Sequence, residues 1–256
     1  MATRPGSLVR YLSQAQAQRI DEELMSTYAF SIDQLMELAG LSVACVVDHE
    51  FAHAIAKPLL VIAGPGNNGG DALVAARHLK HFGFLPEICY PKATSNPLYE
   101  RLVQQCRDLD IPFVPDVTLT SLQERYSLVL DGIFGFSFRG APRAPFDAIL
   151  ATLCRSAAPI VSIDIPSGWD VEAGFPTLQS HDDDDDDDDG GLGKPAGGLD
   201  PHILVSLTAP KACAQHFTGS HYVGGRFVPP ALAKAYNLVT PAYVGSAQFA
   251  RWTSSQ

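Results

Sequence analysis

The feature that most constrains the fold of this chain is a series of short apolar runs, several of which end at a glycine or an aspartate. The runs fall at residues 59–63, 88–90, 111–114, 128–130, 159–163 and 203–207. Stretches with helical spacing of apolar residues separate them, at residues 71–82, 98–106 and 146–154. Strands that are apolar throughout are buried on both faces, so the alternation predicts a mostly parallel sheet with helices on both faces. We therefore expect an α/β, doubly wound, Rossmann-like fold.

The remaining segments set the boundaries of the predicted domain. Helical patterns between residues 11 and 56 predict an N-terminal helical extension. Residues 221–228 predict a last strand, antiparallel or at a sheet edge, before a polar tail. A length of 256 residues suits one α/β domain. We expect a single domain at residues 11–238, a flexible N-terminus at 1–10 and a C-terminal tail at 239–256.

An acidic and glycine-rich stretch interrupts the α/β pattern at residues 174–200. It contains eight consecutive aspartates, Asp182 to Asp189, followed by a glycine-rich segment. Like charges repel and glycine resists ordering, so we expect a disordered insertion loop here rather than a cation site. The formal net charge is −10, and without the aspartate run the chain is nearly neutral. Because such a chain has no strongly basic face, nucleic-acid binding is not expected.

Cysteine usage and hydropathy bear on the compartment. The five cysteines are scattered without a CxxC pair, which argues against a zinc site or a disulfide framework and favours a reducing compartment. No apolar stretch approaches the length of a membrane span, so no membrane association is expected. Arg4, Arg10 and Arg19 precede the first acidic residue, Asp21, which leaves a mitochondrial presequence open. We expect a cytoplasmic protein, with the mitochondrion as the alternative.

The strongest local motif is the glycine-rich segment Gly64-Pro65-Gly66-Asn67-Asn68-Gly69-Gly70-Asp71, between a predicted strand and a predicted helix. Glycines in this context let the backbone approach a phosphate, and the helix N–H groups can hold the anion. A nicotinamide-dependent dehydrogenase would also carry an acid at the end of the second strand, to bind the ribose hydroxyls. Residues 89–92 read Cys-Tyr-Pro-Lys, so the hydride-transfer reading is disfavoured.

Polar residues follow three further strands. Asp131 and Asp164 each come directly after an apolar run, and Thr208 and Lys211 follow the last one. A single aspartate at such a place is often only a helix cap, but several at consecutive strand ends favour a ligand site. Asn68, Asp131 and Ser167 offer the hard oxygen atoms that Group 1 and Group 2 cations prefer. The histidines show no convincing ligand spacing, and neither a G-x-S-x-G elbow nor a Walker A motif is present.

Several of these motifs, in this order, resemble one known family. They are the segment 64–71, Asp131 with residues 135–140, the segment Asp164-Ile165-Pro166-Ser167-Gly168-Trp169-Asp170, and Leu207-Thr208-Ala209-Pro210-Lys211. The N-terminal segments 20–25 and 34–40 fit as well. Together they are similar to the NAD(P)H-hydrate epimerases, the YjeF N-terminal domain family, over roughly residues 11–238. One departure is Ala72, where the family usually has glycine.

The resemblance implies an activity and a set of site residues. The expected reaction interconverts the R and S forms of NADHX and NADPHX, which carry a hydroxyl on C6 of the nicotinamide ring. The expected substrate-binding residues are Asn67, Asn68, Gly69, Gly70, Asp71, Gly135, Phe136, Ser137, Phe138, Arg139, Gly140, Ala141 and Asp164. Asn68, Asp131 and Ser167 are expected to hold one K+ per subunit. We take Asp164 as the catalytic acid–base, because it stands at a strand end before a tight turn.

The resemblance also implies partners. A homodimer is expected, with functional coupling to an NAD(P)H-hydrate dehydratase on a separate chain. Domains of this family also occur as non-catalytic, dimeric interaction modules, so a scaffold of the same fold is the alternative. Because the expected catalytic positions are intact in this sequence, catalysis is the favoured reading.

Overall fold

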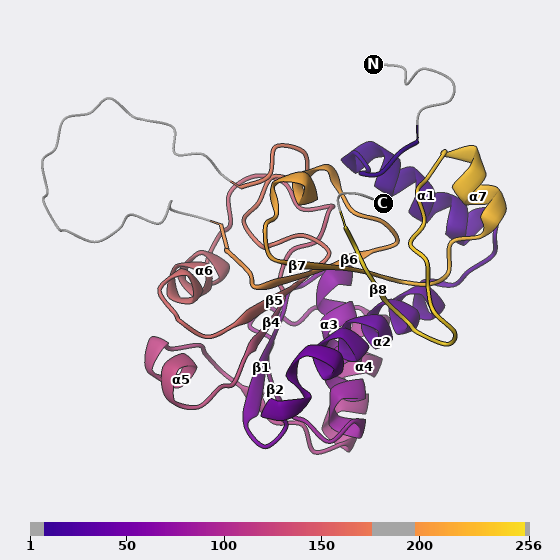
Figure 1. The fold of residues 1–256 in the computed structure, drawn as a ribbon. Helices are drawn as coiled ribbons and strands as arrows, with labels where there is room; N and C mark the ends of the chain where they lie inside the picture. Colours follow the sequence, from indigo (N-terminus) through magenta and orange to yellow (C-terminus); the bar gives the residue numbers. More distant parts are fainter. Residues whose placement is uncertain (1–7, 176–197, 254–256) are drawn as a thin grey trace, which may run out of the picture.

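The computed structural model describes residues 8–175 and 198–253, which form a three-layer α/β domain (Figure 1). Within these ranges one sheet runs in the order β3-β2-β1-β4-β5-β6-β7-β8. All neighbouring strands pair in parallel except β7 and β8. The strands are β1 (Pro58–Ala63), β2 (Leu85–Cys89), β3 (Phe113–Val114), β4 (Val129–Gly132), β5 (Ile160–Ile163), β6 (Ile203–Leu207), β7 (Ser220–Gly224) and β8 (Ala250–Arg251). The predicted Rossmann-like, mostly parallel fold is confirmed.

Helices cover both faces of the sheet. The helices are α1 (Gln14–Ser26), α2 (Ile32–Phe51), α3 (Asn67–His81), α4 (Pro97–Asp108), α5 (Leu119–Glu124), α6 (Phe146–Cys154) and α7 (Pro230–Ala235), with 3-10 turns at Ala52–Ala54 and Ala212–His216. The first hydrophobic cluster packs α2, α3 and α4 against one face of the sheet. A second cluster packs α5 and α6 against the opposite face. A third joins α1 to α7 beside the sheet, and α1 and α2 form the predicted N-terminal helical extension.

Two ends of the chain differ from the sequence-based expectation. Residues 8–10 are not free, because Val9 forms a parallel bridge with Leu238. The segment expected to be a polar tail contains β8, which pairs antiparallel with β7, and Trp252 beyond it is buried. Strand β7 is therefore internal and parallel to its neighbour β6, and the antiparallel edge strand is β8. A two-residue strand such as β8 carries no apolar run, so sequence periodicity does not reveal it.

The predicted insertion loop falls largely outside the described residues, which end at 175 and resume at 198. Its described flanks are anchored to the sheet's carboxyl end. Gly174 and Asp170 exchange two backbone hydrogen bonds of 2.9 Å, and the Leu199 N–H donates to the Ser167 carbonyl at 3.0 Å. The Asp182–Asp189 run itself lies outside the described part.

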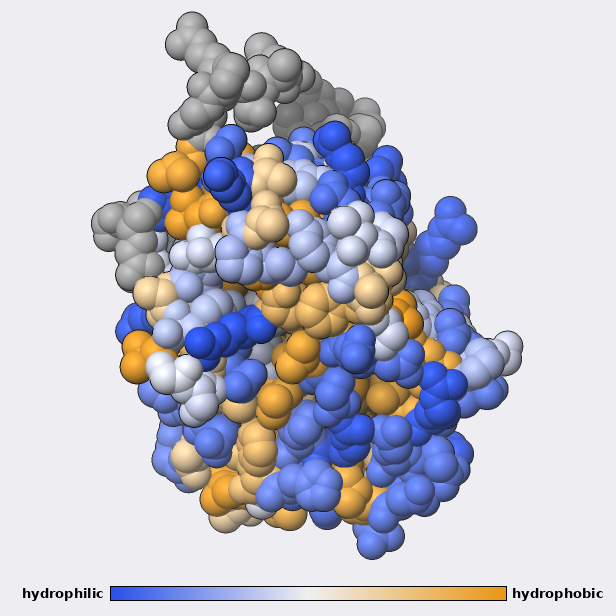
Figure 2. All heavy atoms as spheres, turned by 90° about the vertical axis from the view of Figure 1, so that its right-hand side faces the viewer, coloured by the Kyte–Doolittle hydropathy of each residue, from blue (hydrophilic) through white to orange (hydrophobic). Residues whose placement is uncertain are grey.

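The face at the right of Figure 1 is mainly hydrophilic, with hydrophobic residues gathered in patches between hydrophilic ones (Figure 2). Across the described residues, no helix is both long and apolar enough to cross a membrane.

The sheet topology determines where a ligand can bind. Strand β1 lies between β2 and β4, so the chain winds outward in opposite directions from β1. In open α/β sheets, ligands bind in the crevice outside the carboxyl ends of the strands at such a switch point. In the register of β1 with β4, Ile62 lies beside Asp131 and Ala63 beside Gly132. The glycine-rich segment and Asp131 therefore leave the sheet side by side.

Candidate active site

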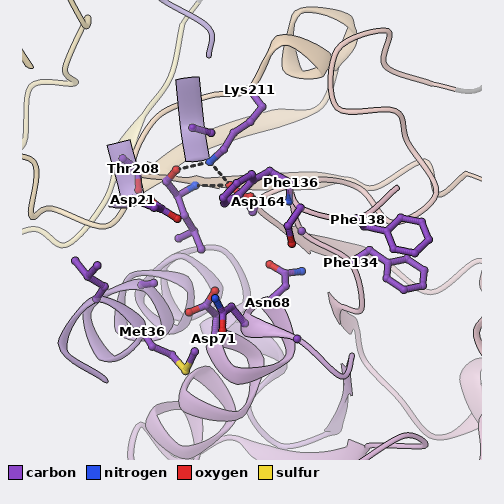
Figure 3. A pocket seen from close by; sticks show the side chains of 18 of the residues that line it. Asp21, Met36, Asn68, Asp71, Phe134, Phe136, Phe138, Asp164, Thr208 and Lys211 are labelled. Carbon is purple, nitrogen blue, oxygen red and sulfur yellow. Dashed lines mark hydrogen bonds and ion pairs between the residues drawn. The ribbon is translucent and has the colours of Figure 1, made fainter. Parts of the chain in front are cut away.

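A cavity of about 480 Å³ opens at this switch point. Its floor is formed by the segments that follow β1, β4, β5 and β6, and helices α1 and α2 supply the facing wall. Figure 3 shows Asp71, Asn68 and Met36 on helices at one side, with Asp164, Thr208 and Lys211 across from them. The lining mixes apolar side chains with a few convergent charged groups, as ligand sites do.

The glycine-rich segment is shaped by close backbone contacts. A Cβ on Gly64 would lie 1.8 Å from the Ile133 carbonyl oxygen, and one on Gly69 would lie 1.9 Å from the Gly64 carbonyl oxygen. Neither position accepts a side chain, because backbone atoms cannot rotate away. Gly66 is the N-cap residue of α3, and a Cβ there would meet nothing within 4 Å. The first turn of α3 therefore presents its backbone N–H groups to the cavity, where they favour an anion.

Asp131 is a fully buried carboxylate held by hydrogen bonds alone. Its Oδ1 accepts from the Ser167 hydroxyl at 2.6 Å and from the Ile133 N–H at 3.2 Å. Its Oδ2 accepts from the Ser162 hydroxyl at 2.8 Å and from the Ser167 N–H at 3.0 Å. Burial raises the pKa of Asp131, and the hydrogen bonds from Ser167 and Ser162 oppose that rise.

Asn68 lies close to the segment that follows Asp131: a Cβ on Gly132 would fall 3.1 Å from the Asn68 backbone carbonyl oxygen. A Cβ on Gly135 would fall 3.2 Å from the Asn68 Cβ, so the loop after β4 crosses directly over the asparagine. The Asn68 amide nitrogen is buried without a hydrogen-bond partner in the described structure. Exchanging the amide oxygen and nitrogen would remove this orphan donor and present an oxygen instead. A buried carboxylate, a hydroxyl and such an amide oxygen are a donor set that fits a monovalent cation.

Asp164 is fixed in one orientation at the end of β5. Its backbone adopts a left-handed conformation, with φ of 65°, which is uncommon for a residue other than glycine. Its Oδ2 accepts from the Phe136 N–H at 3.3 Å, and its Oδ1 accepts from the Leu207 N–H at 3.2 Å and forms an ion pair with Lys211. The side chain acts as an acceptor in all of these contacts, which is the geometry of a carboxylate.

Lys211 places a buried positive charge beside the cavity. Its ammonium group donates to the Leu207 carbonyl at 2.7 Å in addition to Asp164, and lies 5.4 Å from the centre of the Phe136 ring. The lysine is held there because Leu12, just before α1, forms a parallel bridge with it. The N-terminal extension is therefore joined to the segment after β6 at the edge of the cavity.

Two further carboxyl groups face the cavity. Burial raises the pKa of Asp21 to about 6, with Lys211 lowering it and Asp164 adding to the rise. Burial also raises the pKa of Asp71 well above its ordinary value, and the charges of Asp164 and Asp21 raise it further. Perturbed carboxyl groups converging in a cleft mark a functional site.

Comparison with known proteins identifies the family of this chain. A family model described as YjeF-related protein N-terminus matches residues 32–213, the range that contains the glycine-rich segment, Asp131, Asp164 and Lys211. The chain belongs to this family.

Two further proteins are similar to this family member over nearly its whole length. Over 252 residues it is 48% identical to a protein of Arabidopsis thaliana named pyridoxine/pyridoxamine 5'-phosphate oxidase 1, chloroplastic, covering 94% of this chain and 44% of the relative. The chain thus spans less than half the length of that protein. The crystal structure of yeast ynu0, YNL200c, superposes with a TM-score of 0.84 at 38% identity, covering 95% of this chain and all of that one.

Most of the substrate-binding residues expected from the sequence of this YjeF family member do line the cavity. They are Asn67, Asn68, Asp71, Gly135, Phe136, Ser137, Phe138, Arg139 and Asp164. Gly69, Gly70, Gly140 and Ala141 lie outside the lining. Gly69 and Gly70 lie in α3, where Gly70 makes room for the Met36 side chain: a Cβ there would fall 2.5 Å from its sulfur. The expected cation ligands Asp131 and Ser167 lie behind the cavity wall, fully buried.

Asp21 and Lys211 were not among the expected site residues, although both line the cavity. Lys211 follows the last apolar run in the sequence, which was a signal of its place at a strand end. Asp21 lies within a helical segment, and only the packing of α1 over the sheet's carboxyl end turns it toward the site.

Proposed function

We propose that this chain is an NAD(P)H-hydrate epimerase, which interconverts the R and S forms of NADHX and NADPHX. The observation that carries the proposal is the Asp164 carboxylate, held by Lys211 and two backbone N–H groups at the wall of a cavity that begins at a glycine-rich helix N-terminus. Such a cavity offers one end to the phosphates of a nucleotide and the other to its ring. Family membership supports the same reading.

The two ends of the cavity suit the two ends of the substrate. The first turn of α3, with Asn67 and Gly66, offers N–H groups to the diphosphate. Phe134 and Phe138 stack with ring centres 3.7 Å apart, and Phe136 lines the cavity beside Lys211. Aromatic faces are therefore available for the rings of the nucleotide to pack against. Arg139 adds a positive charge at the loop after β4.

The chemistry requires a carboxylate beside the nicotinamide ring. C6 of the hydrated nicotinamide is a hemiaminal carbon, so the ring nitrogen lone pair expels the hydroxyl and leaves a cationic ring. The fixed charge of Asp164 stabilises that cation without reorganisation at the moment of reaction. Water then adds to the other face of C6 and gives a proton to the carboxylate, and the released hydroxide finally takes up that proton, so that one water leaves for each water that adds. The ring nitrogen regains its lone pair, and the opposite epimer leaves.

Potassium is part of the proposal. Asn68, Asp131 and Ser167 would hold the ion, and its charge would balance the buried Asp131 carboxylate at the base of the loop that lines the cavity. The ion would thereby stabilise the position of residues 133–139, with no direct part in the reaction. The epimer released would be the substrate of a dehydratase on a separate chain.

The experiment is the rate of R-to-S equilibration of NADHX in potassium buffer, with the spontaneous rate as baseline. The wild-type chain should accelerate equilibration, and Asp164→Asn should lose roughly 100-fold or more in rate while still binding the nucleotide. Glu87→Gln is the matched control, because Glu87 is a buried carboxyl bonded to Arg125 and Tyr126 outside the cavity. Absence of acceleration by the wild type, with the nucleotide bound, would refute catalysis and favour the interaction module.

A further inference from the structure

The proposed epimerase reaction needs a proton that Asp164 is poorly placed to supply. Hydroxide is a poor leaving group, so the C6 hydroxyl departs most readily as water, after receiving a proton. Both Asp164 oxygens already accept hydrogen bonds from Phe136 N–H, Leu207 N–H and Lys211. With donors on both oxygens, the Asp164 carboxyl group acts as an acceptor in every contact that it makes. Asp164 is therefore suited to receive a proton rather than to deliver the first one.

Asp71 has the opposite surroundings. The residue is 8% exposed, and it lines the cavity from α3, across from Asp164 and Lys211 (Figure 3). No described residue donates a hydrogen bond to its carboxyl group, and the structure contains no ion pair to it within the same ranges. A buried carboxyl without donors is more stable protonated than ionised, since it loses water without gaining partners.

On balance, the charges that face Asp71 from the surrounding elements also raise its pKa. Asp164 beyond β5 and Asp21 on α1 both raise its pKa, and Lys211 beyond β6 lowers it by less than burial raises it. Tyr99 on α4 is also within electrostatic range. Asp71 and Asp164 thus form a pair of carboxyl groups in contrasting environments: Asp164 accepts from two backbone N–H groups and Lys211, whereas no described residue donates to Asp71.

We propose that Asp71 is the acid that protonates the departing C6 hydroxyl, while Asp164 is the base that takes the proton from the water adding to the opposite face. This inference rests on the proposed epimerase function and assigns the second group of that site. Lys211 is a positioning residue, because it contacts Asp164 and keeps it as the acceptor.

The step balances without any reagent other than water. Asp71 gives its proton to the hydroxyl oxygen, the C6–O bond breaks, and one water leaves. A second water forms a new C6–O bond on the other face and gives one proton to Asp164. The site is left with an ionised Asp71 and a protonated Asp164. Substrate of the opposite configuration reacts with the pair in this state, with Asp164 as the acid and Asp71 as the base. Proton exchange with water through the open cavity restores protonated Asp71 and ionised Asp164.

The test compares substitutions at Asp71 with the wild-type chain. Asp71→Asn keeps the shape of the side chain but cannot donate an acidic proton, so equilibration should slow by roughly 100-fold. Binding of the nucleotide, measured separately by calorimetry, should stay close to that of the wild type. Asp71→Ala leaves space at the same point, so added formic acid should restore part of its rate. Formic acid should not restore Asp164→Asn, because the amide there still fills the space.

The outcomes separate this inference from the proposed function. If the wild type does not accelerate equilibration, the proposed function fails. If the wild type is active and Asp71→Asn keeps its rate, Asp71 is not the acid and the assignment is wrong. If Asp71→Asn loses rate and binding in equal proportion, Asp71 is a binding residue and the assignment is again wrong. Thermal unfolding of Asp71→Asn guards against misfolding: an unchanged or raised Tm with a lost rate supports the assignment. If the Tm of Asp71→Asn is lowered, formic acid rescue of Asp71→Ala becomes the deciding measurement. Absence of rescue would overturn the assignment of Asp71 as the acid.

Discussion

The ion pair between Lys211 and Asp164 predicts an unusual pattern of stabilities. The lysine and the aspartate are 2% and 3% exposed, so neither charge is solvated. Lys211→Met keeps the length of the aliphatic chain but leaves the Asp164 charge buried and uncompensated, which costs about 3–5 kcal/mol. For a chain of this size, each kcal/mol corresponds to roughly 2–4 °C in Tm, so Tm should fall by roughly 6–20 °C.

The double variant isolates the electrostatic part of that loss. In Lys211→Met with Asp164→Asn no charge is left unpaired, and the asparagine oxygen can still accept from the Leu207 or the Phe136 N–H. The double variant should therefore regain about 2–3 kcal/mol relative to Lys211→Met alone. What stays lost is the hydrogen bond to the Leu207 carbonyl and the contact with the Phe136 ring, together about 1–2 kcal/mol.

Urea unfolding of the wild type, both single variants and the double variant measures these differences, provided that the m-values agree. A double variant as unstable as Lys211→Met would refute the reasoning. Such a result would mean that the lysine stabilises the fold by packing and hydrogen bonding, and that the Asp164 charge is tolerated without it.

Three further predictions concern other parts of the structure. Gly64→Ala should cost about 2–3 kcal/mol in thermal unfolding, because its Cβ would collide with the Ile133 carbonyl, whereas Gly66→Ala should cost no more than about 1 kcal/mol. Burial lowers the pKa of His221 to about 4. The unfolded chain therefore takes up a proton that the folded chain does not, and stability should fall as the pH drops from about 6.5 to 4; in His221→Gln this fall should be smaller by roughly 3 kcal/mol. Replacing lithium with potassium should raise Tm, because a potassium concentration of one hundred times the dissociation constant adds about 2.7 kcal/mol to the free energy of unfolding. Asn68→Ala should abolish this effect, and an equal Tm in both salts would contradict the cation site.

The apolar runs predicted the sheet because its central strands are buried on both faces and leave no room for polar residues. The same logic located Asp131 and Asp164, which follow such runs directly and therefore stand at the sheet's carboxyl edge. Strand β8 escaped prediction because its two residues follow no apolar pattern and are placed by pairing with Tyr222 and Val223.

The site was harder to predict where it depends on packing between distant segments. Asp21 reaches the cavity because α1 lies across the end of the sheet, with Leu12 bridged to Lys211 nearly 200 residues later. Nothing local in the sequence around Asp21 distinguishes it from an exposed helical aspartate. Conversely, Gly140 lies in a predicted binding segment but is not among the residues that line the cavity, and a Cβ there would meet nothing within 4 Å.

The most direct measurement follows the oxygen on C6 during equilibration of NADHX in water enriched in oxygen-18. If the cavity acts by expelling and returning water, the wild-type chain should accelerate equilibration, and each newly formed epimer should carry the label at C6. Unaccelerated equilibration, or an accelerated one in which the epimer retains its original oxygen, would contradict loss and return of the hydroxyl in this cavity.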